Sequence, residues 1–361
     1  MNVRKTRVLI VDDSAIVRRV LSDMLSGHSD IEVVATAPDP YVARDKILEL
    51  NPDVLTLDLE MPRMDGLSFL KRLMHFHPLP VIVISSIAVA GREVALEALR
   101  LGAVDVLTKP GGPYTVEDLS AQLVRSVRAA GRARVRTRSH PDEPPEIAAP
   151  RPPEALVSHL PFSSQAVVVI GASTGGVEAI REVLIQLPTN FPPILVVQHI
   201  PRAFSAALAE HLNRACALDI REAQDVNELL PGHVLIAPGD RHMEVRTVGA
   251  KRSVLLTSNP PLNRHRPSVD VLFHSLAKAG ARSAVGVLLT GMGADGAEGL
   301  LALRRGGAAT IAQDEQSSVV YGMPAEAVRL GAAEVVLPLK DIAGGIMRLL
   351  SRAPVRETTR V

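Results

Sequence analysis

The sequence predicts two α/β domains, each built on a doubly wound parallel sheet, with a proline-rich linker between them. In both halves, short apolar runs rich in β-branched residues alternate with amphipathic stretches, which is the pattern of βαβ units. Seven prolines crowd the stretch between the halves. Proline lacks a backbone donor and cannot sit within a helix or a central strand. We therefore expect domains at residues 1–130 and 166–355, a linker at 131–165 and a tail at 356–361.

Five strands are predicted in the first domain. They correspond to the runs RVLIV (7–11), IEVVAT (31–36), VLTLD (54–58), VIVIS (81–85) and VDVLT (104–108). Segments long enough for helices separate them, among them SAIVRRVLSDML and GLSFLKRLMHF. Ligands of such sheets bind beyond the carboxyl ends of the strands, so the residues that end each run are the informative ones.

The second domain resumes the same alternation. Strand ends are predicted at AVVVIGAS, PILVVQHI, VLIAPGD, SVLLTS, AVGVLLTG and AATIAQ. Helices are predicted at VEAIREVLIQL, FSAALAEHLNRA, SVDVLFHSLAKA and DGAEGLLALRRG. The linker opens on alternating arginines, which we interpret as a solvated face.

Composition argues against several classes of function. The chain has 40 Lys and Arg against 39 Asp and Glu, and no Trp, so neither a cationic surface nor aromatic stacking for nucleic acid is expected. The one cysteine, Cys216, excludes an internal disulfide framework and a thiolate zinc site. No apolar run reaches the roughly 18 residues that span a bilayer, and acidic residues come too early for a secretory signal. We expect a cytoplasmic protein with no nucleic-acid partner and no direct membrane insertion.

Polar residues end four strands of the first domain. Asp12 and Asp13 end the first strand, Asp58 the third, Ser85 the fourth and Lys109 the fifth. Three carboxylates at one edge repel each other unless a cation lies among them, and Mg²⁺ suits oxygen ligands. A carboxylate beside Mg²⁺ can accept a phosphoryl group, with the lysine and the serine hydroxyl binding its oxygens. Helix capping would be the simpler explanation for either of the first two aspartates alone.

With its motifs VDDS, LDLEMPRMDG and TKP, the stretch from about residue 5 to 130 resembles the receiver domains of response regulators. The resemblance implies phosphoryl acceptance by Asp58, Mg²⁺ binding by Asp12, Asp13 and Asp58, and phosphate binding by Ser85 and Lys109. Val106 aligns with the aromatic switch residue of many receivers. An aromatic rotamer switch therefore cannot carry the signal here.

The second domain opens with Gly171-Ala172-Ser173-Thr174-Gly175, which matches the nucleophile pattern G-x-S-x-G between a strand and a helix. Backbone N–H groups at such a turn, that of Thr174 among them, can stabilise an oxyanion. A phosphate-binding or dinucleotide turn is the main rival, but its glycine spacing differs. His199 ends an apolar run and is the candidate base, and Asp295 lies in a glycine-rich loop as the candidate orienting acid.

A wider set of motifs extends the comparison to nearly the whole chain. IGASTGG, VVQHI, APGDRHMEV, NRHRPSVDVLFHSLA, LLTGMGADGAEGL and VVYGMPAEA together resemble the chemotaxis protein-glutamate methylesterase family, CheB. The resemblance implies Ser173 as nucleophile, His199 as general base, Asp295 as orienting acid and the Met292 N–H as an oxyanion donor. Four further residues of these motifs are expected to line the substrate groove, with structural pairing as the alternative: His242, Arg264, His265 and Arg266.

The function that follows is a phosphorylation-activated serine esterase. It is expected to hydrolyse glutamate methyl esters on methylated chemoreceptors and to deamidate receptor glutamines, with phosphate supplied by the chemotaxis histidine kinase. Mg²⁺ is expected in the receiver and no cofactor in the catalytic domain. A phospho-dependent receptor-binding module and a methylesterase of a non-chemotaxis array are the alternatives. A DNA-binding regulator is disfavoured because no helix-turn-helix pattern is present.

Overall fold

The computed structural model describes residues 4–62, 64–86, 88–109, 116–135, 162–249 and 251–351. The chain divides into two compact units, Met1–Ile147 and Ala148–Val361. Residues 136–161 of the predicted linker and all of the predicted tail lie outside the described residues. The domain boundaries given above therefore stay predictions.

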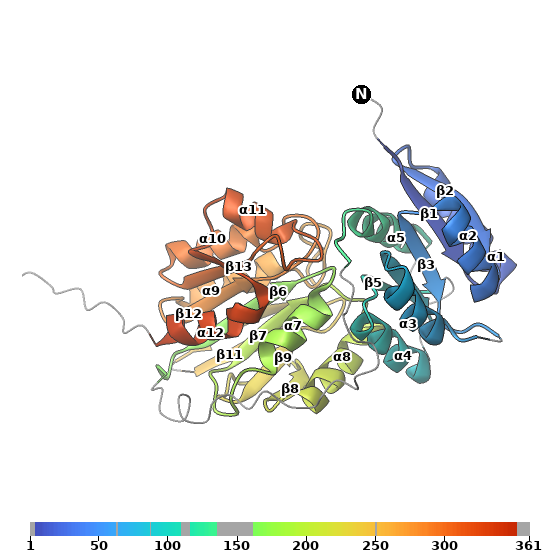
Figure 1. Ribbon diagram of the computed structural model, residues 1–361. Coiled ribbons are helices and arrows are strands. Elements are labelled where there is room, and N and C mark those ends of the chain that lie inside the picture. Colours follow the sequence, from blue (N-terminus) through green and yellow to red (C-terminus); the bar gives the residue numbers. More distant parts are fainter. Residues whose placement is uncertain are drawn as a thin grey trace, which may run out of the picture. The chain divides into compact units, whose positions relative to one another are not determined.

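The first unit is a five-stranded parallel sheet in the order β2-β1-β3-β4-β5, with helices between successive strands (Figure 1). All five predicted strands are present. The strands are β1 (Thr6–Val11), β2 (Ile31–Ala37), β3 (Val54–Asp58), β4 (Val81–Ser85) and β5 (Asp105–Thr108). The helices are α1 (Ala15–Ser26), α2 (Pro40–Leu50), α3 (Gly66–Phe76), α4 (Val89–Arg100) and α5 (Val116–Ala130).

Local sequence explains where three of these helices begin. Ser14, Asp39 and Asp65 precede α1, α2 and α3, and each side chain accepts a hydrogen bond from a backbone N–H of the first turn. Such caps satisfy donors that have no partner within the helix. β3 and β4 are buried along their whole length, as strands covered on both faces must be.

The second unit holds a seven-stranded sheet in the order β14-β13-β12-β6-β7-β9-β8, in which every pair is parallel. The strands are β6 (Val167–Ala172), β7 (Ile194–Gln198), β8 (Asp219–Glu222), β9 (His233–Ile236), β12 (Ala284–Leu288), β13 (Ala309–Gln313) and β14 (Val335–Leu337). The helices are α7 (Gly176–Leu184), α8 (Arg202–Ala215), α9 (Val269–Ala279), α10 (Ala297–Arg305), α11 (Met323–Arg329) and α12 (Leu339–Leu350). The predicted doubly wound α/β class is confirmed for both units.

One strand prediction needs a correction. The run SVLLTS does form a strand, but it belongs to a separate antiparallel hairpin of β10 (His242–Val248) and β11 (Lys251–Thr257). The hairpin buries Met243, Val245 and Val254 against the core that α9 and α10 share with the sheet. Because β10 alternates apolar and polar residues, its one-sided burial matches an antiparallel pair rather than a central parallel strand.

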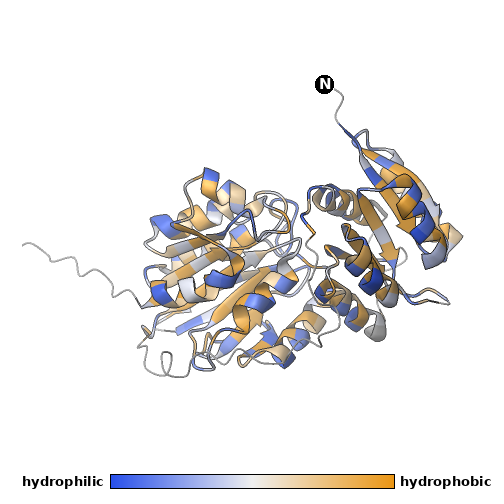
Figure 2. Cartoon of the chain, viewed as in Figure 1, coloured by the Kyte–Doolittle hydropathy of each residue, from blue (hydrophilic) through white to orange (hydrophobic). Residues whose placement is uncertain are grey.

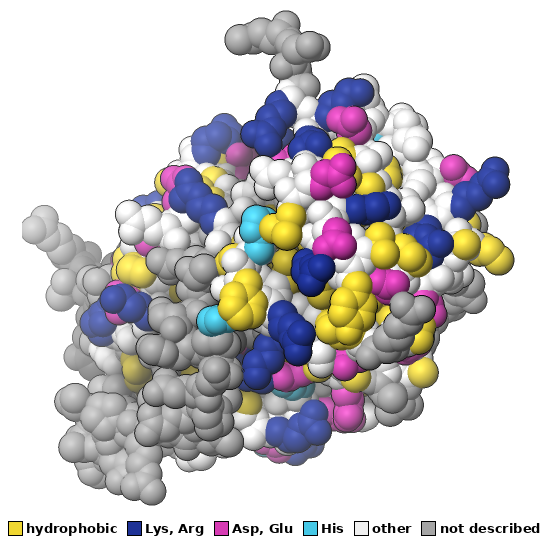
Figure 3. All heavy atoms as spheres, turned by 45° about the vertical axis from the view of Figure 1, so that its right-hand side comes forward, with side chains coloured by type: hydrophobic (Ala, Val, Ile, Leu, Met, Phe, Trp, Pro, Cys, Tyr) yellow, Lys and Arg dark blue, Asp and Glu magenta, His cyan; other side chains and the backbone are white. Residues whose placement is uncertain are grey.

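Hydropathy follows this architecture. Strands are largely apolar, whereas helices carry hydrophilic residues along one side (Figure 2). On the face shown in Figure 3, basic and acidic side chains are interspersed. Among the described residues, no helix is long and apolar enough to cross a membrane.

The strand orders locate the ligand-binding edges. In the first sheet the chain turns one way from β1 to β2 and the other way to β3, so its direction reverses beside β1. In the second sheet β7 pairs with one side of β6 and β12 with the other, so the direction of the chain reverses beside β6. Doubly wound sheets bind ligands at such switch points, beyond the carboxyl ends of the strands. The predicted acidic cluster and the predicted nucleophile follow these strands.

Candidate active site and phosphorylation site

Ser173 occupies the predicted turn between β6 and α7. Its backbone N–H donates to the Thr290 carbonyl over 3.0 Å. Its carbonyl accepts hydrogen bonds from the Gly176 N–H at 2.7 Å and from Gln198 Nε2 at 2.8 Å. The turn is therefore fixed from three directions, and the N–H of Ser173 itself is already used.

His199 and Asp295 reach this edge from opposite sides of β6. β7 pairs with β6 with Gln198 opposite Ala172, and the His199 N–H donates to the Ala172 carbonyl. Asp295 comes from the loop after β12, the neighbour of β6 on the other side. The side chains meet with His199 Nε2 2.8 Å from Asp295 Oδ2. Both side chains are almost fully buried, at 7% and 2% exposure.

Asp295 is held by more than the histidine. Its Oδ1 accepts from Ser268 Oγ at 2.7 Å and from Asn263 Nδ2 at 3.0 Å, and its Oδ2 accepts from the Val269 N–H at 2.7 Å. Ser268 is the N-cap of α9, so the carboxylate sits at the positive end of a helix. Sequence reasoning assigned no role to these three partners, although all lie within the motif NRHRPSVDV.

The pKa values of two neighbouring buried carboxyls, Asp295 and Asp270, are shifted in opposite directions. Burial raises the pKa of Asp295, but hydrogen bonds from His199, Asn263 and Ser268 outweigh it and hold that pKa well below its usual range. Asp270 is also buried, and burial together with the negative charge of Asp295 raises its pKa. Asp295 is therefore the ionised partner of the histidine.

The second nitrogen of His199 is the reactive candidate. Nδ1 is buried and has no hydrogen-bond partner among the described residues, so the serine hydroxyl does not bond to it in this state. A nucleophile–base contact that tightens only with substrate is common in free enzymes. The imidazole of His265 stacks on that of His199 with ring centroids 3.7 Å apart and planes 5° from parallel. The stack fixes the plane of the candidate base.

The backbone N–H groups of Thr174 and Met292 are the two candidate oxyanion donors. Neither the N–H of Thr174 nor that of Met292 donates a hydrogen bond within the described part of the chain. Gly291, which precedes Met292, packs so closely that a Cβ would lie 2.7 Å from the Cβ of Ser173. The Gly291 carbonyl accepts from the Met323 N–H at 2.8 Å, which gives the motif VVYGMPAEA a role in holding this loop.

The structure gives different surroundings to the residues that were expected to line the substrate groove. The expectation is wrong for His242, which is 1% exposed, bonds through Nε2 to the Pro260 carbonyl and accepts the Ser268 N–H at Nδ1. That ring supports the segment that anchors Asp295. Arg266 pairs with Asp240, in line with the alternative of structural pairing, and its side chain also lines a cavity of this unit, so its place in the substrate groove stays a prediction. Arg264 is exposed and adopts a left-handed backbone with φ 67°.

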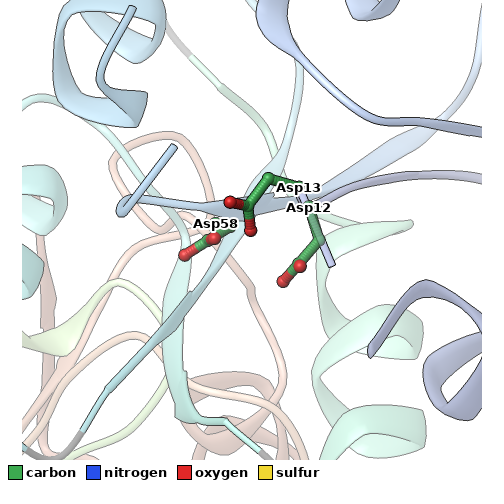
Figure 4. Close-up of side chains that lie close together, drawn as sticks. All are labelled: Asp12, Asp13 and Asp58. Atoms are coloured by element: carbon green, nitrogen blue, oxygen red, sulfur yellow. The ribbon is translucent and has the colours of Figure 1, made fainter. Parts of the chain in front are cut away.

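The first unit brings its predicted acidic residues together. Asp12 and Asp13 follow β1 and Asp58 ends β3, and oxygens of all three lie within 4.8 Å of one another (Figure 4). Asp12 Oδ2 is buried and has no hydrogen-bond partner among the described residues, as expected for an atom that faces a cation site. Hard carboxylate oxygens at this spacing fit Mg²⁺. Lys109 Nζ lies 2.7 Å from Asp58 Oδ2 and 3.7 Å from Asp12 Oδ2.

Electrostatics single out Asp58. Burial raises its pKa to about 6, despite the hydrogen bond from Lys109. Burial lowers the pKa of Lys109, but the bond to Asp58 and the charges of Asp58 and Asp12 outweigh it and raise that pKa. The Ser85 hydroxyl is buried and donates to the Gly91 carbonyl at 3.0 Å. Val106 is buried within β5 at 1% exposure.

These two sites define a class of protein, a receiver joined to a serine-hydrolase-like α/β unit. Comparison with known proteins makes this specific. The family model "CheB methylesterase" matches residues 168–346, and "Response regulator receiver domain" matches residues 8–120. The chain is 51% identical to a protein-glutamate methylesterase/protein-glutamine glutaminase of Syntrophus aciditrophicus over 96% of this chain and 99% of that one. It is 49% identical to the protein of that name from Salmonella typhimurium, over 96% and 97%.

A solved structure agrees with the second unit. The CheB methylesterase catalytic domain of Thermotoga maritima has a TM-score of 0.50 and 38% identity, covering 51% of this chain and 97% of that one. The chain belongs to the CheB methylesterase family, with a receiver domain at its N-terminal side. The family predicted from the motifs is thereby confirmed.

Proposed function

We propose that the chain is a phosphorylation-activated methylesterase that hydrolyses glutamate methyl esters on chemoreceptors and deamidates receptor glutamines. The observation that carries the proposal is the buried 2.8 Å contact between His199 and Asp295 at the edge where Ser173 turns into α7. A nucleophile, a base and an orienting acid on neighbouring strand ends are the requirements of acyl transfer.

The chemistry follows from which atoms are already engaged. Ser173 Oγ attacks the ester carbonyl while Nδ1 of His199, the nitrogen not bonded to Asp295, takes the hydroxyl proton. The N–H groups of Thr174 and Met292 donate to the oxyanion. The histidine then passes the proton to the departing methoxide, which leaves as methanol, or to the departing amide nitrogen of a glutamine, which leaves as ammonia. Water, deprotonated by the same nitrogen, releases the glutamate carboxylate and restores the serine.

The receiver supplies the control. Asp12, Asp13 and Asp58 would hold Mg²⁺, which when bound neutralises charge on the incoming phosphoryl group. An oxygen of Asp58 accepts that group from a phosphohistidine of the chemotaxis kinase, and Lys109 pairs with its oxygens. We propose that the unphosphorylated receiver restrains the catalytic unit and that the protein works in the cytoplasm.

The test is methanol release from methylated chemoreceptor membranes, with and without acetyl phosphate and Mg²⁺. We expect the wild-type rate to rise with the phosphodonor. Ser173→Ala should lose on the order of 10⁴–10⁶ in turnover. Ser164→Ala, an exposed serine of the same unit, is the matched control. A Ser173→Ala protein with most of its activity would refute the nucleophile.

The other outcomes are equally decisive. A rate that ignores the phosphodonor would keep the esterase and remove the switch. A truncated chain of residues 166–361 that is no faster than the unphosphorylated full chain would show that the receiver does not inhibit. No methanol under any condition would favour a receptor-binding module.

A further inference from the structure

A cavity of about 400 Å³ in the catalytic unit is lined by several charged side chains. Two links tie it to His199. Arg202, on its wall, follows the histidine by three residues and opens α8. Arg266, also on its wall, follows His265, whose ring stacks on His199. The mechanism above uses none of the side chains that line this cavity.

The walls carry three arginines and two carboxylates, and both carboxylates already accept hydrogen bonds. Glu222 accepts a hydrogen bond from Ser205 Oγ, which in turn accepts the Gly239 N–H at 3.0 Å. Asp240 accepts two bonds from Arg266, through Nε at 2.9 Å and Nη2 at 2.6 Å. Nη1 of Arg266 donates hydrogen bonds to the carbonyls of residues 258 and 259. Both acids and this arginine therefore already have partners within the unit.

Arg241 is different. The one hydrogen bond of its side chain within the described residues runs from Nη2 to the Leu256 carbonyl at 2.8 Å, and it forms no ion pair there. Its Nε is buried and has no hydrogen-bond partner among those residues. A guanidinium N–H that is removed from water without an acceptor carries a cost that an incoming anion would relieve. Carboxylates match the fork of guanidinium donors in two-point contacts.

The substrate supplies such an anion. Under the proposed function, the enzyme converts methylated glutamates or glutamines of the substrate protein into glutamates. A segment with several of these residues therefore presents free carboxylates beside the ester that remains. We propose that this cavity binds a carboxylate side chain of the substrate protein that neighbours the scissile ester, with Arg241 as its partner. The cavity would then select acidic segments. This proposal rests on the proposed function.

Kinetics with matched variants test the proposal. Arg241→Gln removes the charge and Arg241→Lys keeps it. Arg246→Gln is the matched control, because it removes the next arginine along the chain, which is exposed on β10. Each is assayed on methylated receptor membranes and on p-nitrophenyl acetate, which has no carboxylate. For Arg241→Gln we expect the ratio of kcat/KM on receptor to that on p-nitrophenyl acetate to fall about tenfold or more, mainly through KM. Arg241→Lys should recover part of the loss, and Arg246→Gln should match wild type.

A binding measurement keeps the two proposals apart. The Nε–Hε NMR signal of Arg241, assigned by its loss in Arg241→Lys, should shift on titration with a tetraglutamate peptide and not with tetraglutamine. Absence of the shift, or an Arg241→Gln ratio equal to that of Arg246→Gln, overturns the carboxylate site. If wild type releases no methanol from receptors, the proposed function fails, and the peptide titration alone decides whether the cavity binds carboxylates.

Discussion

The change Asp295→Asn tests the electrostatic half of the proposed mechanism. The asparagine side chain can be accommodated with its NH₂ group at the position of Oδ1. There the Ser268 hydroxyl, which donates to the native carboxylate, can rotate and accept a hydrogen bond from the NH₂ group instead. Its oxygen can then keep the 2.8 Å contact with His199 Nε2. Geometry is therefore largely preserved, and the lost quantity is the negative charge that stabilises the imidazolium formed during catalysis.

The size of that loss follows from the distance. Opposite charges about 4 Å apart at an effective dielectric of about 20 interact by about 4 kcal/mol, and each 1.36 kcal/mol on a barrier is tenfold in rate. We expect kcat for methanol release to fall on the order of 10³-fold. The Asn263 amide is left facing a donor, so a loss of about 1–3 kcal/mol in unfolding free energy is also expected, measured by urea denaturation.

Asp270→Asn is the matched control. This buried carboxyl shares the Asn263 amide with Asp295 but makes no hydrogen bond to His199, and burial, followed by the negative charge of Asp295, raises its pKa. Its kcat should stay within about tenfold of wild type. An Asp295→Asn enzyme that is equally active, while folded under the assay conditions, would refute the reasoning.

Three further outcomes are expected. Asp58→Asn should abolish the phosphodonor response and, in EDTA, should stabilise the protein at pH 7.5 by up to about 3 kcal/mol, because the acid's pKa is about 6 in the fold against 3.8 in the unfolded chain. The stability penalty of ionised Asp58 is absent below pH 3.8 and grows as pH rises through 6, so urea titrations of the two proteins should converge on acidification. Removing Mg²⁺ with EDTA should cancel activation and leave the basal esterase rate, as a methanol assay would show. Gly291→Ala should cost about 1–3 kcal/mol of unfolding free energy and much of the activity, because its Cβ would collide with Met323 Sδ and the Cβ of Ser173. Gly27→Ala, whose Cβ would meet no described atom within 4 Å, should be nearly neutral when both variants are compared by urea denaturation.

Strand prediction succeeded where burial on both faces leaves a continuous apolar run. β3 and β4 are examples. It missed β8, β10 and β14, which were not among the predicted runs. Among the described residues β8 reads DIRE and pairs only with β9, β10 pairs only with β11, and β14 is three residues long and pairs only with β13. Edge strands need little hydrophobic signal, because only one of their sides is paired within the sheet.

The sequence by itself determined the two sheets and which residues end their central strands. Parallel strands place all their carboxyl ends at one edge, so residues distant in the chain, such as Asp12 and Asp58, were expected together before any coordinates. Only the tertiary structure decided how Asp295 is held, that His242 is a buried support, and that Arg241 lines a cavity while forming no ion pair with the described residues. These are contacts between loops, whose paths are set by packing over the whole unit rather than by a local period.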